Sequence, residues 1–493
     1  MEKLAINFDN SFSSLPADFY SKTFPEKMPN LELIRLNKSL CDLLDLSSEN
    51  LASRDGVKFL GGEKILKNSI PLAQAYAGHQ FGNFVPSLGD GRAILLGELI
   101  GKDGIRRDIQ LKGSGRTPFS RMGDGRAGLG PILREYIVSE AMNSFRIPTT
   151  RTLAALFTGE TVQRDSIIPG ALLTRVAKSH IRVGTFEYFS CRNQHENIKI
   201  LADYVIRRHY PQLNNSTKPY LAFLNEVIKN QAELIANWMS VGFIHGVMNT
   251  DNMTVSGETI DFGPCAFMDS FNKNQVYSSI DVQGRYSYEN QPLIAAWNLS
   301  RLAETILPLI DNDIDKSILL AQESLKEFSS IFKARKMEIM GAKIGINYVE
   351  RGDEILIESL FQMMEDGQAD FTLTFSTLSD AIEKNSYQKW KALFSNIPDD
   401  TISNWLKKWE KRLMRSSLEK KEVINHLKIT NPRIIPRNHL IEACISEALT
   451  GNLGQFNEFV KALEDPYTQR EEIVKYSKPP EPWEIVQETF CGT

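Results

Sequence analysis

The stretch HGVMNTDNMTVSGETIDFGPC, residues 245–265, contains the pattern that decides the fold. Asn252 and Asp261 carry an amide oxygen and a carboxylate, which are hard ligands suited to a divalent metal bound to nucleotide phosphates. An amphipathic segment at 220–239 leads into the stretch and predicts a long helix. A helix that delivers such a loop indicates a nucleotide-binding site.

The spacing of this stretch is that of a protein kinase catalytic loop. Kinase loops read H-R-D-L-x-x-x-N and are followed by D-F-G. His245, Asn252 and Asp261-Phe262-Gly263 match, whereas the position of the kinase base is Val247. The site therefore has the metal ligands of a kinase but lacks its catalytic aspartate.

Predicted strands precede this stretch and predicted helices follow it. Segments 92–100 and 105–112 flank a Gly-Lys-Asp-Gly turn and predict a β-hairpin, and the leucine-rich segment 30–51 predicts a packed helical extension. Further strands are expected at 153–157, 161–164 and 171–177, and helices at 131–145, 292–310, 314–335, 378–396, 400–415 and 436–464.

This order predicts a bilobal α+β enzyme, and the kinase-like spacing of His245, Asn252 and Asp261 indicates a protein-kinase-like fold with added helical extensions. We expect an N-terminal extension at 1–80, a strand-rich N-lobe with nucleotide-binding loops at 81–218, and a helical C-lobe at 219–493. The C-lobe carries the catalytic and DFG loops and the C-terminal tail.

Composition narrows the class of protein. The 493 residues have a formal net charge of -4, without the basic excess of a general nucleic-acid or membrane-surface binder. We expect no membrane span, because no segment approaches the ~18 apolar residues that one needs. The first residues also lack the pattern of a signal or transit peptide. These features predict a cytoplasmic protein.

The five cysteines are scattered and predict neither a disulfide framework nor a zinc site.

Lys112 is a candidate phosphate ligand, because it closes the strand IQLK as the β3 lysine of a kinase does. An isolated lysine at the end of a strand is more often a solvated charge. A glutamate partner on the next helix would favour the phosphate-binding interpretation. Glu135 is the preferred partner, and Glu140 is the alternative.

Glycine and arginine are concentrated on both sides of Lys112. The tetrapeptide GDGR occurs at 89–92 and again at 123–126. Glycine lets backbone N–H groups approach an anion, and arginine gives bidentate phosphate contacts, so the two loops predict a phosphate cradle. Arg175 and Arg182 add two cations that an ordinary kinase does not need there.

These motifs resemble the selenoprotein O family of protein adenylyltransferases, which have a protein-kinase-like fold. The resemblance covers nearly the whole chain. It is carried by AYAGHQFGNFVPSLGDGRAILLGE, IQLKGSGRTPFSRMGDGRAGLGP, PTTRTLAAL, LLTRVAKSHIRVGTFE, FIHGVMNTDNM, IDFGPCAFMD, QGRYSYENQPLIAAWNL and NPRIIPRNHLIEACI.

The resemblance implies transfer of AMP, or of UMP from UTP, to Ser, Thr or Tyr hydroxyls of protein substrates, with release of diphosphate. ATP would be inverted relative to kinases, with its γ-phosphate deep in the pocket. Asp251 would be the proton acceptor, and Asn252 and Asp261 would hold Mg²⁺ or Mn²⁺. The nucleotide-binding residues implied are Gly89, Gly91, Arg92, Lys112, Asp124, Gly125, Arg175, Arg182 and Asp261.

Two other functions fit the motifs: an ordinary phosphotransferase with Asp251 as a displaced base, and a nucleotide-binding pseudokinase scaffold. The pair of metal ligands argues against a pure scaffold. Some members of the family carry selenocysteine near the C-terminus, where this chain has Cys491. A regulatory disulfide from this tail would need a second cysteine in the segment after the DFG motif. That segment offers only Cys265 and has Tyr277 further along, so a redox switch is not expected.

Overall fold

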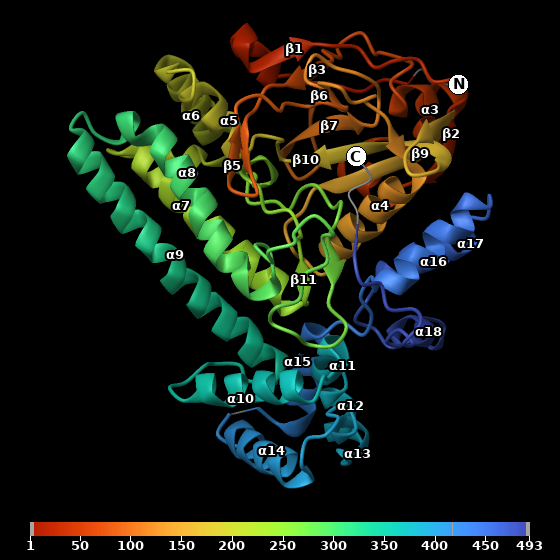
Figure 1. Ribbon diagram of the computed structural model, residues 1–493, viewed down its shortest axis with the longest axis vertical. Helices are drawn as coiled ribbons and strands as arrows, with labels where there is room; N and C mark the ends of the chain where they lie inside the picture. The colour runs from red at the N-terminus through yellow and green to blue at the C-terminus, as the bar shows by residue number, and fades with distance from the viewer. Residues whose placement is uncertain (1–3, 417, 490–493) are drawn as a thin grey trace.

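The computed structural model describes residues 4–416 and 418–489. Its first half is built on one antiparallel sheet with the order β1-β3-β6-β7-β10-β9-β2 (Figure 1). In that order the strands are Tyr20–Lys22, Leu72–Gln74, Ala93–Ile100, Arg106–Lys112, Ile167–Ala177, Arg151–Gln163 and Glu32–Leu36, and the short β8, Ala127–Gly128, pairs with β10.

Both faces of this sheet are buried. Successive residues alternate between two cores: Leu95 and Leu173 belong to the core shared with α4 (Leu129–Ser144), whereas Leu96 and Leu172 face the N-terminal helices. Those helices are α1 (Lys38–Leu43), α2 (Ser48–Ala52) and α3 (Arg54–Leu60). The sheet is therefore a central layer with helices on both sides.

The predicted hairpin is confirmed as β6 and β7, joined at Gly101–Gly104. The strands predicted at 153–157 and 161–164 form one long strand, β9. Its partner β10 begins at Ile167, earlier than the predicted strand at 171–177, so that Pro169 and Gly170 lie within the strand. A register shift between Pro169 and Ala171 lets the ladder continue past the proline.

The helical prediction for 30–51 is wrong at its start. Glu32–Leu36 is β2, which pairs with β9 and covers an edge of the sheet that would otherwise expose unpaired backbone groups. Residues 1–80 thus contribute three strands, β1, β2 and β3, to the same sheet as β6 and β7. The division of the chain at residue 80 stays a prediction.

The second half is helical, which confirms the α+β class. Helices α7, α8 and α9 pack side by side, and a group of shorter helices, α10 to α15, follows at the far end of α9 (Figure 1). The helices from α5 on are Val183–Ser190, His195–His209, Pro219–Ser240, Gln291–Ile310, Ile314–Lys343, Asp353–Asp366, Phe371–Ser376, Leu378–Glu383, Gln388–Lys391, Asp399–Leu413, Lys420–Thr430, Asn438–Leu449, Gly454–Leu463 and Val474–Ser477.

Two of the predicted helices are divided. The segment 378–396 breaks at Asn385, and 436–464 breaks at Gly451; both residues have positive φ, which a helix does not allow. Sequence patterns missed α5, α6, α10, α11, α15 and α18. Helices α16 and α17 return to the sheet and pack on α4 (Figure 1).

Two small antiparallel ladders position the 245–265 stretch. Strand β11 (Phe243–Ile244) enters it and pairs with β12 (Ala266–Phe267), which leaves it. The hairpin of β4 (Gly78–Gln80) and β5 (Asn83–Val85) contacts the 3₁₀ turn η4, Thr250–Asn252, within it. The loop is thus held both at its base and at its tip.

The expectation that no segment approaches a membrane span is wrong. By length and composition alone, residues 288–310 are long and apolar enough to cross a membrane, with a mean hydropathy of 1.2. Half of that apolar window is buried in the protein, where α8 packs on α5, α7 and α9. Burial by neighbouring helices is a sufficient reason for its apolar character.

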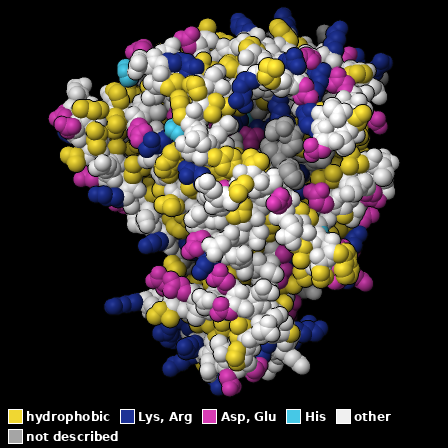
Figure 2. Space-filling model, in the orientation of Figure 1, with side chains coloured by type: hydrophobic (Ala, Val, Ile, Leu, Met, Phe, Trp, Pro, Cys, Tyr) yellow, Lys and Arg dark blue, Asp and Glu magenta, His cyan; other side chains and the backbone are white. Residues whose placement is uncertain are grey.

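Charged side chains of both signs are intermixed on the face seen in Figure 2, without a large area of one sign. This distribution agrees with the small net charge of the chain. The cytoplasmic location stays a prediction.

Candidate functional site

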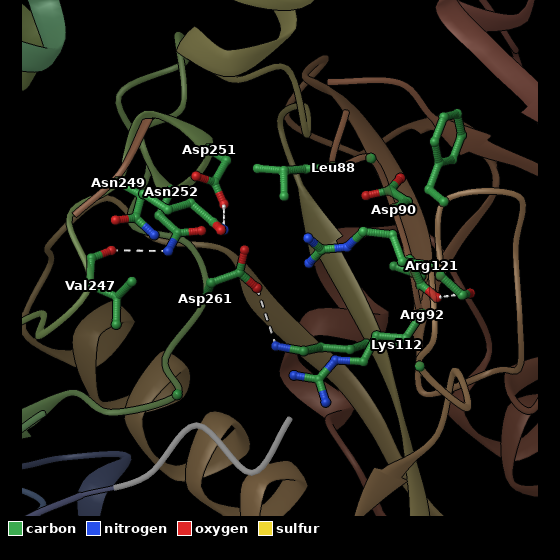
Figure 3. A pocket seen from close by; sticks show the side chains of 18 of the residues that line it. Leu88, Asp90, Arg92, Lys112, Arg121, Val247, Asn249, Asp251, Asn252 and Asp261 are labelled. Carbon is green, nitrogen blue, oxygen red and sulfur yellow. Dashed lines mark hydrogen bonds and ion pairs between the residues drawn. The ribbon is translucent and has the colours of Figure 1, made fainter. Parts of the chain in front are cut away.

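A cavity of about 810 Å³ lies between the sheet and the 245–265 stretch (Figure 3). Its volume is in the range of sites that enclose a nucleotide-sized ligand. All the residues predicted to bind nucleotide or metal, or to act as base, line it: Gly89, Gly91, Arg92, Lys112, Asp124, Gly125, Arg175, Arg182, Asp251, Asn252 and Asp261. Their roles stay predictions.

A network of buried charges forms the inner wall of this cavity. Lys112 Nζ lies 2.6 Å from Glu135 Oε2 and 3.2 Å from Asp261 Oδ1. Arg175 Nη2 lies 2.5 Å from Glu135 Oε1 and 2.7 Å from Asp261 Oδ1. The alternative partner, Glu140, pairs with Arg151 instead. Glu135 therefore holds both Lys112 and Arg175 beside Asp261.

Arg182 completes the set of cations around Asp261. Its Nη1 lies 2.7 Å from Asp261 Oδ2 and donates to the carbonyl oxygen of Asp251, and its guanidinium lies over the ring of Tyr76. Burial would raise the pKa of Asp261, but Arg175, Lys112 and Arg182 hold that pKa well below its ordinary value. Asp261 is therefore ionised throughout the physiological range.

Asp251, the predicted base, is in a different electrostatic environment. Its Oδ2 accepts a hydrogen bond from Gln80 Nε2 at 3.3 Å, while its buried Oδ1 has no hydrogen-bond partner among the described residues. Burial raises the pKa of Asp251 to about 7, against the opposing effect of Arg182. A carboxylate with such a pKa can accept a proton near neutral pH.

Asn252 is oriented by Val247, the residue at the position where a kinase sequence has its base. Its Nδ2 donates to the carbonyl oxygen of Val247 at 2.9 Å, which leaves the amide oxygen for a ligand. Figure 3 shows Asn252 and Asp261 on the same wall of the cavity.

The donor set fits a hard divalent ion, such as Mg²⁺ or Mn²⁺, that takes its remaining ligands from phosphate and water. Within residues 4–416 and 418–489, no group of three or more His, Cys, Asp or Glu residues could hold a metal by itself. An ion at this site would therefore depend on the nucleotide for some of its ligands.

The two GDGR loops form the opposite wall. Gly89 and Gly125 have φ of 72° and 71°, and a Cβ on Gly125 would lie 2.2 Å from the backbone of Gly115. Glycine is therefore required at Gly125, where the second loop packs against the Gly115 backbone. Asp124 pairs with Arg164 at 2.8 Å, whereas the side chains of Arg92 and Arg121 lie along the cavity in Figure 3.

Sequence reasoning missed several residues that line the cavity: Tyr76, Gln80, Asp90, Arg164 and Asn249. Asp90 is buried and accepts from the backbone of Gln74 and from Gln110, and burial raises its pKa to about 6. Its position within the first GDGR copy, equivalent to that of Asp124 in the second, could have identified it. For Gln80, nothing in the sequence indicates a contact with a loop so distant along the chain.

Cys491 lies outside the described residues. Cys265 is buried beside the cavity wall, and its Sγ contacts the carbonyl oxygen of Phe262 at 3.4 Å.

The chain is similar to known proteins along nearly its full length. Residues 2–464 match the family model described as "Protein adenylyltransferase SelO". The chain is 51% identical over 488 residues to the "Protein nucleotidyltransferase YdiU" of Rhodopseudomonas palustris (strain BisB5), covering 99% of both chains. It is 51% identical over 490 residues to the protein of that name from Rhizobium meliloti (strain 1021), covering 99% of this chain and 100% of the relative.

Proposed function

Because this chain belongs to the SelO family of protein adenylyltransferases, and is thus a protein nucleotidyltransferase, we propose that it transfers AMP from ATP to Ser, Thr or Tyr hydroxyls of proteins. UTP is the alternative donor, and diphosphate is released. We propose further that the fold is kinase-like, with the cavity between an N-lobe at 81–218 and a C-lobe at 219–493.

One observation carries the proposal: the cavity has more cations than a kinase site requires. Its lining includes Arg92, Lys112, Arg121, Arg126, Arg164, Arg175 and Arg182, against Asp90, Asp124, Asp251 and Asp261. Permanent guanidinium charges are suited to holding the β- and γ-phosphates of a nucleotide in a buried position. This favours an inverted ATP, with the γ-phosphate innermost and the α-phosphate nearer the opening.

In the proposed step, the acceptor hydroxyl oxygen forms a bond to the α-phosphorus while the bond from that phosphorus to the bridging oxygen of diphosphate breaks. The hydroxyl proton passes to the Asp251 carboxylate, and the electron pair of the broken bond leaves with diphosphate. Lys112, Arg175 and Arg182 would neutralise charge on the phosphates. A metal ion held by Asn252 and Asp261 would supply further charge neutralisation there.

A phosphotransferase with Asp251 as a displaced base is the second candidate, because the Lys112–Glu135 ion pair and Asp261 are also features of kinases. Incubation with ATP labelled in turn at the α- and γ-phosphates distinguishes the two functions. We expect label on protein from α-labelled ATP only, and a mass increase of one AMP. Label from the γ position alone would overturn AMP transfer in favour of a kinase, and no label from either ATP or from α-labelled UTP would favour a nucleotide-binding scaffold. Asp261→Ala is the negative control.

A further inference from the structure

We propose that the β4–β5 hairpin, residues 78–85, positions the catalytic loop, and that Gln80 is a positioning residue for Asp251. The inference rests on the proposed function, in which Asp251 accepts the proton. It assigns a role to the segment GHQFGNFV, which neither the metal ligands nor the phosphate-binding residues explain.

Three consecutive residues of the hairpin contact three consecutive residues of the loop. The N–H of His79 donates to Thr250 Oγ1 at 2.6 Å, Gln80 Nε2 donates to Asp251 Oδ2 at 3.3 Å, and the N–H of Phe81 donates to Asn249 Oδ1 at 3.0 Å. Two of these donors are backbone groups, so the path of the hairpin itself sets the position of the loop. Gln80 adds the contact that reaches the proposed base.

The space around Asp251 is also determined by the hairpin. A Cβ on Gly78 would lie 2.6 Å from Asp251 Oδ1, so this oxygen packs against the glycine backbone. Asp251 Oδ1 is buried and lacks a hydrogen-bond partner in the described part of the chain. The carboxylate is thus covered on one oxygen and hydrogen-bonded on the other, which restricts its rotation.

Buried and half-buried side chains hold the hairpin and the loop together. His79 Nδ1 lies 2.5 Å from Glu187 Oε1 on α5, and the other oxygen of Glu187 accepts from Thr250 Oγ1. Tyr286 OH donates to Asn249 Oδ1 at 2.7 Å and accepts from the N–H of Phe81 at 3.2 Å. Because these contacts do not involve Gln80, its removal should leave the loop attached to the hairpin but loosen it locally at Asp251 and Asn252.

A double-mutant cycle with Gln80→Ala and Asp251→Ala tests this role. Misplacing a reacting group by about 1 Å can cost ~10²-fold in rate, so we expect Gln80→Ala to lower kcat for AMP transfer about 10- to 100-fold. The KM for ATP and the Tm should change little. In the Asp251→Ala background the same substitution should cost less than about twofold. Asn83→Ala is the matched control, since Asn83 is exposed on the same hairpin and should retain wild-type kcat.

An equal loss of kcat in both backgrounds, or an unchanged kcat in Gln80→Ala, would overturn the positioning role and leave AMP transfer itself intact. An unchanged kcat in Asp251→Ala would overturn both that role and the assignment of Asp251 as base. Amide hydrogen exchange gives a readout independent of activity. We expect about tenfold faster exchange for the Asp251 and Asn252 amides in Gln80→Ala than in Asn83→Ala. Equal exchange in the two variants would contradict positioning even if no transfer activity were found.

Discussion

At the scale of single residues, Asp261 is the centre of the site. Lys112, Arg175 and Arg182 surround it, and its φ of 64° lies in a region that aspartate adopts infrequently. Such backbone strain persists where surrounding contacts enforce it, and it is common at functional sites. Three cations face the two carboxylates of Asp261 and Glu135, so one positive charge remains to attract phosphate.

We expect Asp261→Asn to separate nucleotide binding from metal binding. The amide keeps the shape but removes the negative charge that repels phosphate, so ATP should bind at least as tightly as in wild type without metal. The enhancement of binding by Mg²⁺ or Mn²⁺ should be lost, because a hard cation prefers a carboxylate ligand. Calorimetric titration of ATP with and without each metal checks this. Metal enhancement that survives in Asp261→Asn would contradict Asp261 as a ligand.

The other aspartate should respond differently. We expect Asp251→Ala to retain metal-enhanced ATP binding and to lower turnover by about 10²–10⁴-fold, the usual contribution of a positioned base. Steady-state rates measured with saturating ATP and a fixed acceptor protein check this. Turnover at the wild-type level would reject Asp251 as the proton acceptor.

At the scale of elements, strand register explains how the cations converge. Lys112 lies opposite Leu173, and Arg175 lies opposite Gln110, in the β7–β10 ladder. Residues directly opposite each other share a face, so Lys112 and Arg175 both project from the face that carries α4 and Glu135. Sequence patterns located the strands and each cation, but the register that aligns them depends on pairing between segments far apart in the chain.

The first turn of α5 makes a close approach that requires glycine. A Cβ on Gly184 would lie 2.0 Å from the carbonyl oxygen of Ala77, directly before β4. We expect Gly184→Ala to destabilise the protein by about 2 kcal/mol or more, because backbone must move to relieve the overlap. Urea unfolding checks this. Gly130→Ala in α4 is the control, since its added Cβ would meet the side chain of Ile445 at 3.2 Å; an equal loss in both variants would contradict the argument.

At the scale of the whole molecule, sequence patterns predicted which residues line the cavity better than they predicted the fold. Motif residues are recognisable because metal and phosphate chemistry restricts both their type and their spacing. Contacts between distant segments are not restricted in this way, and two were missed: Glu32–Leu36 completes the sheet at β9, and Gln80 reaches Asp251. Helix breaks at Asn385 and Gly451 depend on local backbone angles that apolar periodicity does not reveal.

A buried lysine lies where α9 meets the shorter helices beyond it. Lys343, the last residue of α9, is 3% exposed, and its ammonium lies 4.5 Å from the ring centre of Phe375 in α11. Burial lowers the pKa of Lys343 from 10.5 to about 7. Between these two values the unfolded chain holds a proton that the folded protein has released, so this group makes stability rise with pH across that window.

Replacing this lysine should therefore stabilise the protein most at the pH values where burying the amine costs the most free energy. We expect Lys343→Met to raise the free energy of unfolding by about 1–3 kcal/mol near pH 7, with the gain shrinking as pH approaches 10, since one pKa unit corresponds to about 1.4 kcal/mol. Urea unfolding of wild type and variant at pH 7, 8, 9 and 10 measures it. Lys333→Met, at an exposed position of the same helix, should show no such trend. A loss of stability in Lys343→Met at every pH would instead mean that the aromatic ring stabilises a charged ammonium there.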